Sequence, residues 1–133
     1  MKLLRLAVGI GCDRGVSVET LESALTEALS LCAQSKAQIE SLASIELKRD
    51  EKALQEFANK NGWKIKFYPA TELAQVNVPN PSETVRRYTG TPAVAEAAVL
   101  LAVNSGLENL IIEKYKYLGK DGKNATVSIA RFD

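Results

Sequence analysis

The stretch with the most reactive side chains is GIGCDRG at residues 9–15, where three glycines surround a cysteine, an aspartate and an arginine. An apolar run, LLRLAV, precedes it and VSVETLESAL follows it, which predicts a strand, a glycine turn and a helix start. Backbone N–H groups at a helix start are unpaired and carry the positive end of the helix dipole, which suits an anion. Gly11 and Gly15 let a ligand approach the backbone, and the forked Arg14 suits a carboxylate or phosphate. The stretch predicts an anion site, although a tight turn that needs glycine only for its backbone angles explains the same residues.

Two known nucleotide motifs are similar to this stretch, and neither fits it. In a dinucleotide fingerprint the glycines follow G-x-G-x-x-G, whereas here the third glycine, Gly15, comes one residue late. The acid expected at the end of the second strand also comes too late, at Glu40 or Glu46. A Walker A loop needs a Gly-Lys-Ser/Thr sequence, which does not follow. No nicotinamide or flavin cofactor is therefore expected, and a small nucleotide- or phosphate-binding protein is a minor alternative.

Further polar segments are predicted at the carboxyl ends of strands, where parallel sheets bind their ligands. They are ASIELKRDE (43–51), VPNPSETVRRYTGTP (78–92) and the end of the fourth strand. A single exposed charge is usually only solvated, so the gathering of several at one edge is what predicts a cationic, amide-lined site. The candidate ligand-binding residues are Gly11, Cys12, Arg14, Gly15, Ser44, Lys48, Asn80, Ser82, Gly90, Thr91 and Lys114.

Acid–base chemistry in this chain has to proceed without histidine, which is absent. This excludes histidine-based triads and histidine-containing zinc sites, and we expect no metal site. Glu96 lies in an otherwise apolar helix start, AVAEAAV, where a buried carboxylate needs a cation such as Lys48 or Lys114. Glu96 or Glu51 is a candidate general base, and Lys48 or Lys114 is a candidate oxyanion stabiliser. A satisfied buried ion pair explains Glu96 equally well. Cys12 lies near a helix start, but a cysteine nucleophile without a partner base is disfavoured.

A succession of strands and helices has to position these residues. Strands are predicted at 3–9, 39–45, 63–68, 107–115 and 125–132, and helices at 17–34, 50–61, 82–88 and 93–106. Ser17 is a good N-cap, Asp50 is expected to cap the second helix, and Asn61-Gly62 is a left-handed C-cap signal. The alternation predicts a single α/β domain of three α/β/α layers with a mostly parallel sheet of about five strands, the C-terminal hairpin strand being antiparallel.

Bulk properties narrow the class of protein. A length of 133 residues fits one domain covering 1–133, and a net charge of +1 gives no overall field that would favour nucleic acid or an anionic membrane. No apolar stretch is long enough to span a bilayer, and the first residues are interpreted as a strand and not as a signal peptide. With two cysteines and no export signal, we expect a reduced, cytoplasmic protein without nucleic-acid or membrane partners.

Five segments in order resemble the CbiG/CobE family of cobalamin (vitamin B12) biosynthesis. They are GIGCDRG, LASIELKRDEKAL (42–54), VPNPSETV (78–85), GTPAVAEAAVLLA (90–102) and EKYKYLGKDGKNATVSIAR (113–131). The chain is most similar to the C-terminal domain of CbiG, to which CobE is the free-standing relative. The resemblance implies an α/β fold. CbiG proteins hydrolyse the lactone ring of a cobalt-precorrin and release acetaldehyde, whereas the role of CobE in the oxygen-dependent branch is poorly defined.

The resemblance implies that this chain binds a precorrin or cobalt-precorrin and assists the hydrolysis of its lactone ring. Such tetrapyrroles carry many carboxylates, which helix starts and arginine forks can receive. No cofactor is implied, and cobalt would enter only as part of the tetrapyrrole substrate. Because the N-terminal portion of full-length CbiG is missing from this sequence, the alternative is a non-catalytic carrier or interaction module for other cobalamin-pathway enzymes. Its contact surfaces would be WKIKFY (63–68) and the C-terminal hairpin.

Overall fold

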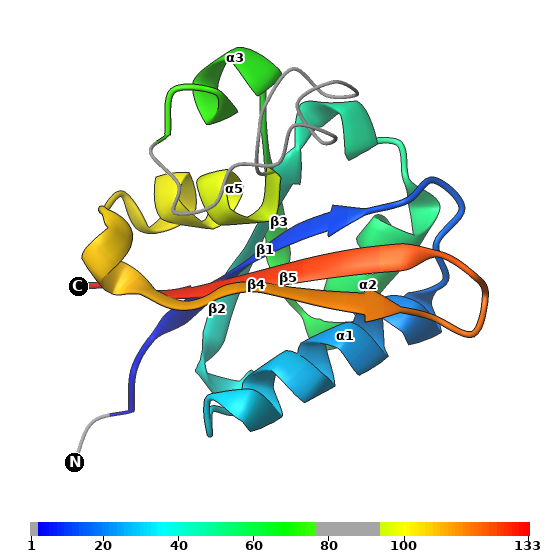
Figure 1. The fold of residues 1–133 in the computed structure, drawn as a ribbon, viewed down its shortest axis with the longest axis horizontal. Coiled ribbons are helices and arrows are strands. Elements are labelled where there is room, and N and C mark those ends of the chain that lie inside the picture. The colour runs from blue at the N-terminus through cyan, green and yellow to red at the C-terminus, as the bar shows by residue number, and fades with distance from the viewer. Residues whose placement is uncertain (1–2, 77–93) are drawn as a thin grey trace.

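The computed structural model of the chain describes residues 3–76 and 94–133, and the statements below concern those residues. Strands and helices alternate along the chain (Figure 1). The strands are β1 (Leu6–Cys12), β2 (Ile39–Ile45), β3 (Lys64–Tyr68), β4 (Leu110–Leu118) and β5 (Asn124–Arg131). The helices are α1 (Val18–Leu31), α2 (Lys52–Asn61), α3 (Ala70–Leu73) and α5 (Val94–Val103), with single 3-10 turns at Lys36–Gln38, Glu46–Lys48 and Leu107–Asn109. The predicted helix at 82–88 lies outside the described residues.

Local signals in the sequence set most of the helix ends. The Ser17 hydroxyl accepts a hydrogen bond from the backbone N–H of Thr20, as expected of an N-cap. Gly62 closes α2 in the left-handed conformation at φ 74°, as its position predicted. The expected cap at Asp50 is wrong, because α2 begins one residue later with Glu51 at the N-cap position. Helix α1 ends at Leu31, before the predicted residue 34, because the chain turns at Ala33 with φ 56°. No helix in the described ranges is both long and apolar enough to cross a membrane.

The five strands form one mixed sheet in the order β3-β2-β1-β5-β4. The pairs β3–β2 and β2–β1 are parallel, whereas β1–β5 and β5–β4 are antiparallel. The expected α/β class, the five-stranded sheet and the antiparallel C-terminal strand are confirmed. Strand β5 is antiparallel to the other four and lies inside the sheet, between β1 and β4. Half of the strand pairs are therefore antiparallel.

The two faces of β1 pack against different helices, as the alternation of a strand requires. Leu6, Val8 and Ile10 belong to a core cluster shared with residues of α1 and α2. Ala7 packs instead with residues of α5, which lies across the opposite face (Figure 1). A side chain at Gly9 would overlap the carbonyl oxygen of Ala95, so α5 rests directly on bare backbone. The first turn of α5 thus lies beside the carboxyl half of β1.

Strand β4 is a sheet edge with two irregularities in its pairing with β5. One falls between Leu110 and Ile112, and the other between Ile112 and Tyr115. In the second, residues 113 and 114 lie opposite the single residue Ser128, which is the arrangement of a β-bulge. The strand also runs farther than predicted, to Leu118, which places residue 114 near its middle.

Candidate functional site

The glycine turn after β1 is tied to the connection between β2 and α2. An Arg14 Nη1 lies 2.6 Å from a carboxylate oxygen of Asp50 and 3.6 Å from one of Glu51. Its other guanidinium nitrogen donates to the carbonyl of Leu47. The predicted convergence of these two loops is therefore present in the structure. The arginine fork, however, is engaged by acceptors of the chain itself.

Cys12 and Lys48 lie at this same junction. Burial raises the pKa of the Cys12 thiol to about 11, an effect that Lys48 opposes and Glu51 reinforces. The thiol is protonated near neutral pH, which argues against a thiolate nucleophile. Lys48 is half-buried, and within the described ranges no ion pair or hydrogen bond engages its amine. Glu51 is almost fully buried, so the junction holds one carboxylate and one amine in a partly enclosed setting.

Ser44, Gly15 and Gly11, the last of which lies within β1, have backbone roles. The hydroxyl of Ser44 is fully buried and donates to the carbonyl of Ile10 at 2.6 Å. Gly15 adopts φ 80°, which favours glycine, beside the side chain of Lys123. Gly11 turns its bare Cα toward Val94 at the start of α5. Of these three, Gly11 lies where a ligand under α5 could reach the backbone.

The start of α1, expected to be an open anion site, is occupied by a carboxylate of the chain. Asp121, in the β4–β5 hairpin, accepts the backbone N–H of Ser17 at 2.9 Å and that of Lys123 at 3.0 Å. These backbone hydrogen bonds, that of Lys123 above all, lower the pKa of Asp121 to about 2. The backbone N–H of Ser17 therefore already has an acceptor within the chain. The sequence GKDGKN is typical of a hairpin turn, and the docking of its aspartate on α1 has no local signal.

The second group of predicted residues lies under α5. Glu96 is 1% exposed, and its Oε1 lies 3.2 Å from the amine of Lys114. Its Oε2 is buried without a hydrogen-bond partner in the part of the chain that the structure describes. Burial raises the pKa of the Glu96 carboxyl, against the opposing effect of Lys114. The predicted pairing of Glu96 with a lysine is thus present, and one carboxylate oxygen is left without a described partner.

Lys114 does not follow the fourth strand, as we expected, but lies within β4. It points to the α5 face, while Tyr115 packs against the core cluster on the α1 face. Cys12 packs against that α1-side cluster. The predicted residues that the structure describes thus form two groups, one around Cys12, Arg14 and Lys48 and the other around Glu96 and Lys114. Asn80, Ser82, Gly90 and Thr91 lie outside the described residues.

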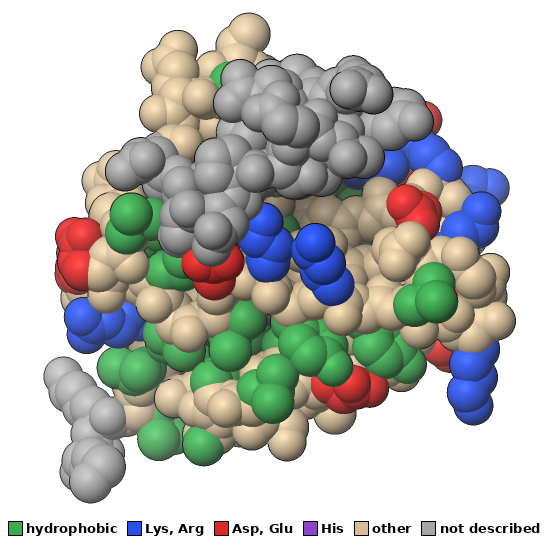
Figure 2. All heavy atoms as spheres, viewed as in Figure 1, with side chains coloured by type: hydrophobic (Ala, Val, Ile, Leu, Met, Phe, Trp, Pro, Cys, Tyr) green, Lys and Arg blue, Asp and Glu red, His purple; other side chains and the backbone are tan. Residues whose placement is uncertain are grey.

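The surface charges agree with this division. Figure 2 shows basic and acidic side chains side by side above β4, and other basic side chains around the ends of β1 and β2. No three cysteine, aspartate or glutamate side chains in residues 3–76 and 94–133 are placed to hold a metal ion.

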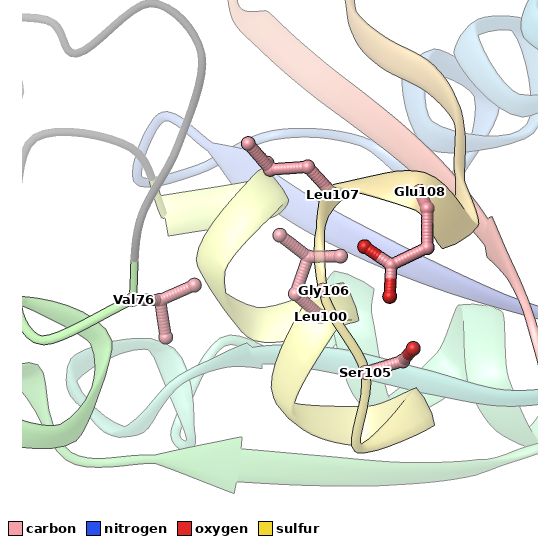
Figure 3. Close-up of a pocket in the computed structure, with 6 residues that line it drawn as sticks. All are labelled: Val76, Leu100, Ser105, Gly106, Leu107 and Glu108. Carbon is pink, nitrogen blue, oxygen red and sulfur yellow. The ribbon is translucent and has the colours of Figure 1, made fainter.

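A hollow of about 470 Å³ lies at the other end of α5, away from Glu96 (Figure 3). Its lining contains one carboxylate and no basic side chain, with Glu108 turned toward the hollow. Such a surface does not suit a polycarboxylate ligand. The lining residues are Val76, Leu100, Ser105, Gly106, Leu107 and Glu108.

The chain matches the protein family described as "Cobalamin synthesis G C-terminus" over residues 6–130. It is 38% identical over 125 residues to a cobalt-precorrin-5A hydrolase of Priestia megaterium, covering 94% of this chain and 32% of that protein. It is 31% identical over 109 residues to protein CobE of Sinorhizobium sp, covering 80% of this chain and 70% of that protein.

Among solved structures, the crystal structure of CobE, a protein from the cobalamin biosynthetic pathway, is similar with a TM-score of 0.83 and 32% sequence identity. The match covers 100% of this chain and 96% of the CobE chain. The chain thus spans about a third of the hydrolase and nearly all of the CobE structure. It belongs to the CbiG/CobE family of cobalamin biosynthesis proteins.

Proposed function

We propose that this chain binds a precorrin or cobalt-precorrin and assists the hydrolysis of its lactone ring. The observation that carries the proposal is the buried Glu96–Lys114 pair, in which Oε2 has no described partner. A buried carboxylate oxygen without a partner is costly, and such costs are typically retained at functional sites. The name of the hydrolase relative supplies the substrate class.

In the proposed reaction, Glu96 is the general base. Its carboxylate accepts a proton from water while the water oxygen attacks the lactone carbonyl, and Lys114 stabilises the oxyanion that forms. The bond between the carbonyl carbon and the ring oxygen then breaks, and the leaving oxygen takes up the proton held by Glu96 to become a hydroxyl group. The other product is a carboxylic acid, which loses its remaining proton to solvent. A carboxyl whose pKa is raised by burial is better suited to accept and return a proton near neutral pH than an exposed one.

The junction around Lys48 would hold a peripheral carboxylate of the same macrocycle. Its amine has no described partner and projects from the 3-10 turn Glu46–Lys48, at the carboxyl end of β2. Glu51, 3.6 Å from Arg14, is the second candidate base. The remaining predicted binding residues stay proposals; they are Gly11, Cys12, Arg14, Gly15, Ser44, Asn80, Ser82, Gly90 and Thr91.

Two measurements test the proposal. The first is the change in melting temperature with tetrapyrroles that carry several carboxylates, compared with a tetrapyrrole esterified at those groups. The second is acetaldehyde release from the lactone-bearing cobalt-precorrin by the wild type, Glu96→Gln and Glu51→Gln. We expect binding by the wild type and loss of release in Glu96→Gln, with Glu51→Gln retaining it. Absence of any tetrapyrrole-dependent shift would overturn the proposal.

A carrier or interaction module for other cobalamin-pathway enzymes is the alternative. It is favoured by the match to almost the whole CobE chain, since a protein of this size exists without the remainder of the hydrolase. Binding of the cobalt-precorrin without acetaldehyde release would select this alternative. A cytoplasmic location is proposed in either case, and the free thiols of Cys12 and Cys32 are consistent with a reducing compartment.

A further inference from the structure

The lysine of the buried pair comes from an irregular point of an edge strand. In β4, Ile112 pairs with Ile129 and Tyr115 pairs with Val127, so two residues of β4 oppose Ser128. The hydroxyl of Ser128 donates to the carbonyl of Glu113 at 2.6 Å. Ser128 is fully buried, and its hydrogen bond joins β5 to the bulge.

The bulge is the part of β4 that carries the lysine. Its two residues, Glu113 and Lys114, lie between the paired residues Ile112 and Tyr115. Tyr115 packs against the α1-side core cluster, whereas the amine of Lys114 lies on the other face, against Glu96 of α5. The path of the backbone through the bulge therefore determines where the amine of Lys114 reaches.

We infer that Ser128 is a positioning residue, which holds the bulge of β4 and thereby keeps the amine of Lys114 against Glu96. The importance of this contact for catalysis rests on the proposed function, but the contact itself does not. The proposed effect of Ser128 on the pair is indirect, because its hydroxyl is bound to the backbone carbonyl of Glu113. Bulges of this kind are often used to redirect a side chain next to a functional site.

The test is the titration of the Glu96 carboxyl in the ligand-free protein. It is followed by ¹³C NMR of glutamate-labelled protein, with the resonance assigned by its loss in Glu96→Gln. The charged groups that act on Glu96 from β4 are Lys114, Lys116 and Glu113. Ser128→Ala removes the hydroxyl that holds the bulge, so the amine moves away and the titration midpoint of Glu96 shifts upward. Lys114→Gln shifts it upward as well, and Ser128→Ala added to Lys114→Gln produces no further shift.

Ser44→Ala is the matched control, because Ser44 is also fully buried and also donates to a backbone carbonyl at 2.6 Å. It should leave the midpoint of Glu96 in place. Ser128→Cys keeps a weaker donor and should shift the midpoint less than Ser128→Ala, which provides a second variant should alanine unfold the chain. Three results would overturn the inference. The titration midpoint of Glu96 could stay unchanged in both Ser128 variants, or Ser128→Ala could shift it as much in the Lys114→Gln background as in the wild type. The third is a shift in Ser44→Ala as large as that in Ser128→Ala. Because no ligand is present, a failure of precorrin binding leaves this result unaffected.

Discussion

Burial determines what the ionisable side chains of this protein can do. Cys12 and Glu96 are both acids whose neutral forms are favoured by desolvation, and the direction of the pKa change is the same for both. The consequence differs with the ordinary pKa of each group. A thiol becomes harder to activate at neutral pH, whereas a carboxyl keeps its proton to a higher pH than an exposed one.

The Cys12 thiol should react slowly with alkylating agents. A pKa of about 11 in place of 9.0 lowers the thiolate fraction at pH 7 roughly a hundredfold. In a Cys32→Ser variant, iodoacetamide should therefore modify the folded protein at least that much more slowly than the protein in urea. Equal rates in the two conditions would show that the thiol is neither buried nor deactivated.

Glu96→Gln should change how stability depends on pH. Because the pKa of Glu96 is raised above its ordinary 4.5, its protonated form stabilises the fold below that pH, and this contribution is lost as the pH rises through the folded-state pKa. The glutamine variant lacks this decline. Urea unfolding across the pH range should show that the wild type loses more stability above pH 4.5 than the variant, and parallel curves would contradict the expected role of burial.

At the scale of elements, two close contacts fix how the helices sit on the sheet. The β4–β5 hairpin closes the start of α1 through Asp121, and α5 lies on the bare backbone of Gly9. Neither contact involves neighbours in the sequence. Local sequence patterns therefore predict neither the position of the hairpin against α1 nor that of α5 against β1.

Asp121→Asn should destabilise the protein at neutral pH and much less in acid. The pKa of Asp121, lowered to about 2 from 3.8, means that its carboxylate contributes stability above 3.8 that is lost as the pH falls through about 2. Chemical unfolding of the variant and the wild type at pH 7 and near pH 2 should show a difference that narrows in acid. Glu56→Gln, an exposed carboxyl on α2, is the control and should show little difference at either pH.

Gly9→Ala should destabilise the fold by about 3 kcal/mol or more, because the added methyl group overlaps the backbone of α5. Gly11→Ala is the matched control two residues along the same strand. Its added carbon would meet Val94 and Thr126 at ordinary distances of 3.8 and 3.9 Å, so its cost should stay below about 1 kcal/mol. Equal losses of stability in thermal or urea unfolding would contradict the close approach of α5 to Gly9.

The sequence was sufficient for elements whose signals are local. The Ser17 and Gly62 caps were correct, and so was the need of Glu96 for a lysine, because a lone carboxylate in an apolar helix requires one. The insertion of β5 beside β1 and the docking of Asp121 on Ser17 depend on contacts between distant segments, which local patterns do not encode. The bulge of β4 has no local signal either, because Ile111, Tyr115 and Tyr117 keep the even spacing of a regular strand.

At the scale of the whole molecule, the sheet has a protected centre and two edges. Strands β1 and β5 each pair with a strand on both sides, and most of their own residues are buried. Strands β3 and β4 are edges with mostly half-exposed residues. The bulges and the lysines of β4 also make that edge a poor template for pairing with another chain.

The rate at which backbone amides exchange with solvent should depend on whether their strand lies inside the sheet or at an edge. Amides of β1 and β5 should be the slowest in hydrogen–deuterium exchange, and those of β3 and of the outer side of β4 the fastest among the strands. Peptide-level mass spectrometry resolves these segments. Uniform protection across all five strands would indicate that the edges are covered in solution.

The internal place of β5 also has a consequence for folding. Strand β1 precedes β5 by more than a hundred residues in the sequence, and its second side stays unpaired until β5 has been synthesised. Until then one flank of β1 is open, and the pair of Glu96 and Lys114 cannot be enclosed, since β4 joins the sheet only through β5. The rate of folding should therefore be limited by closure of the long loop between β1 and β5.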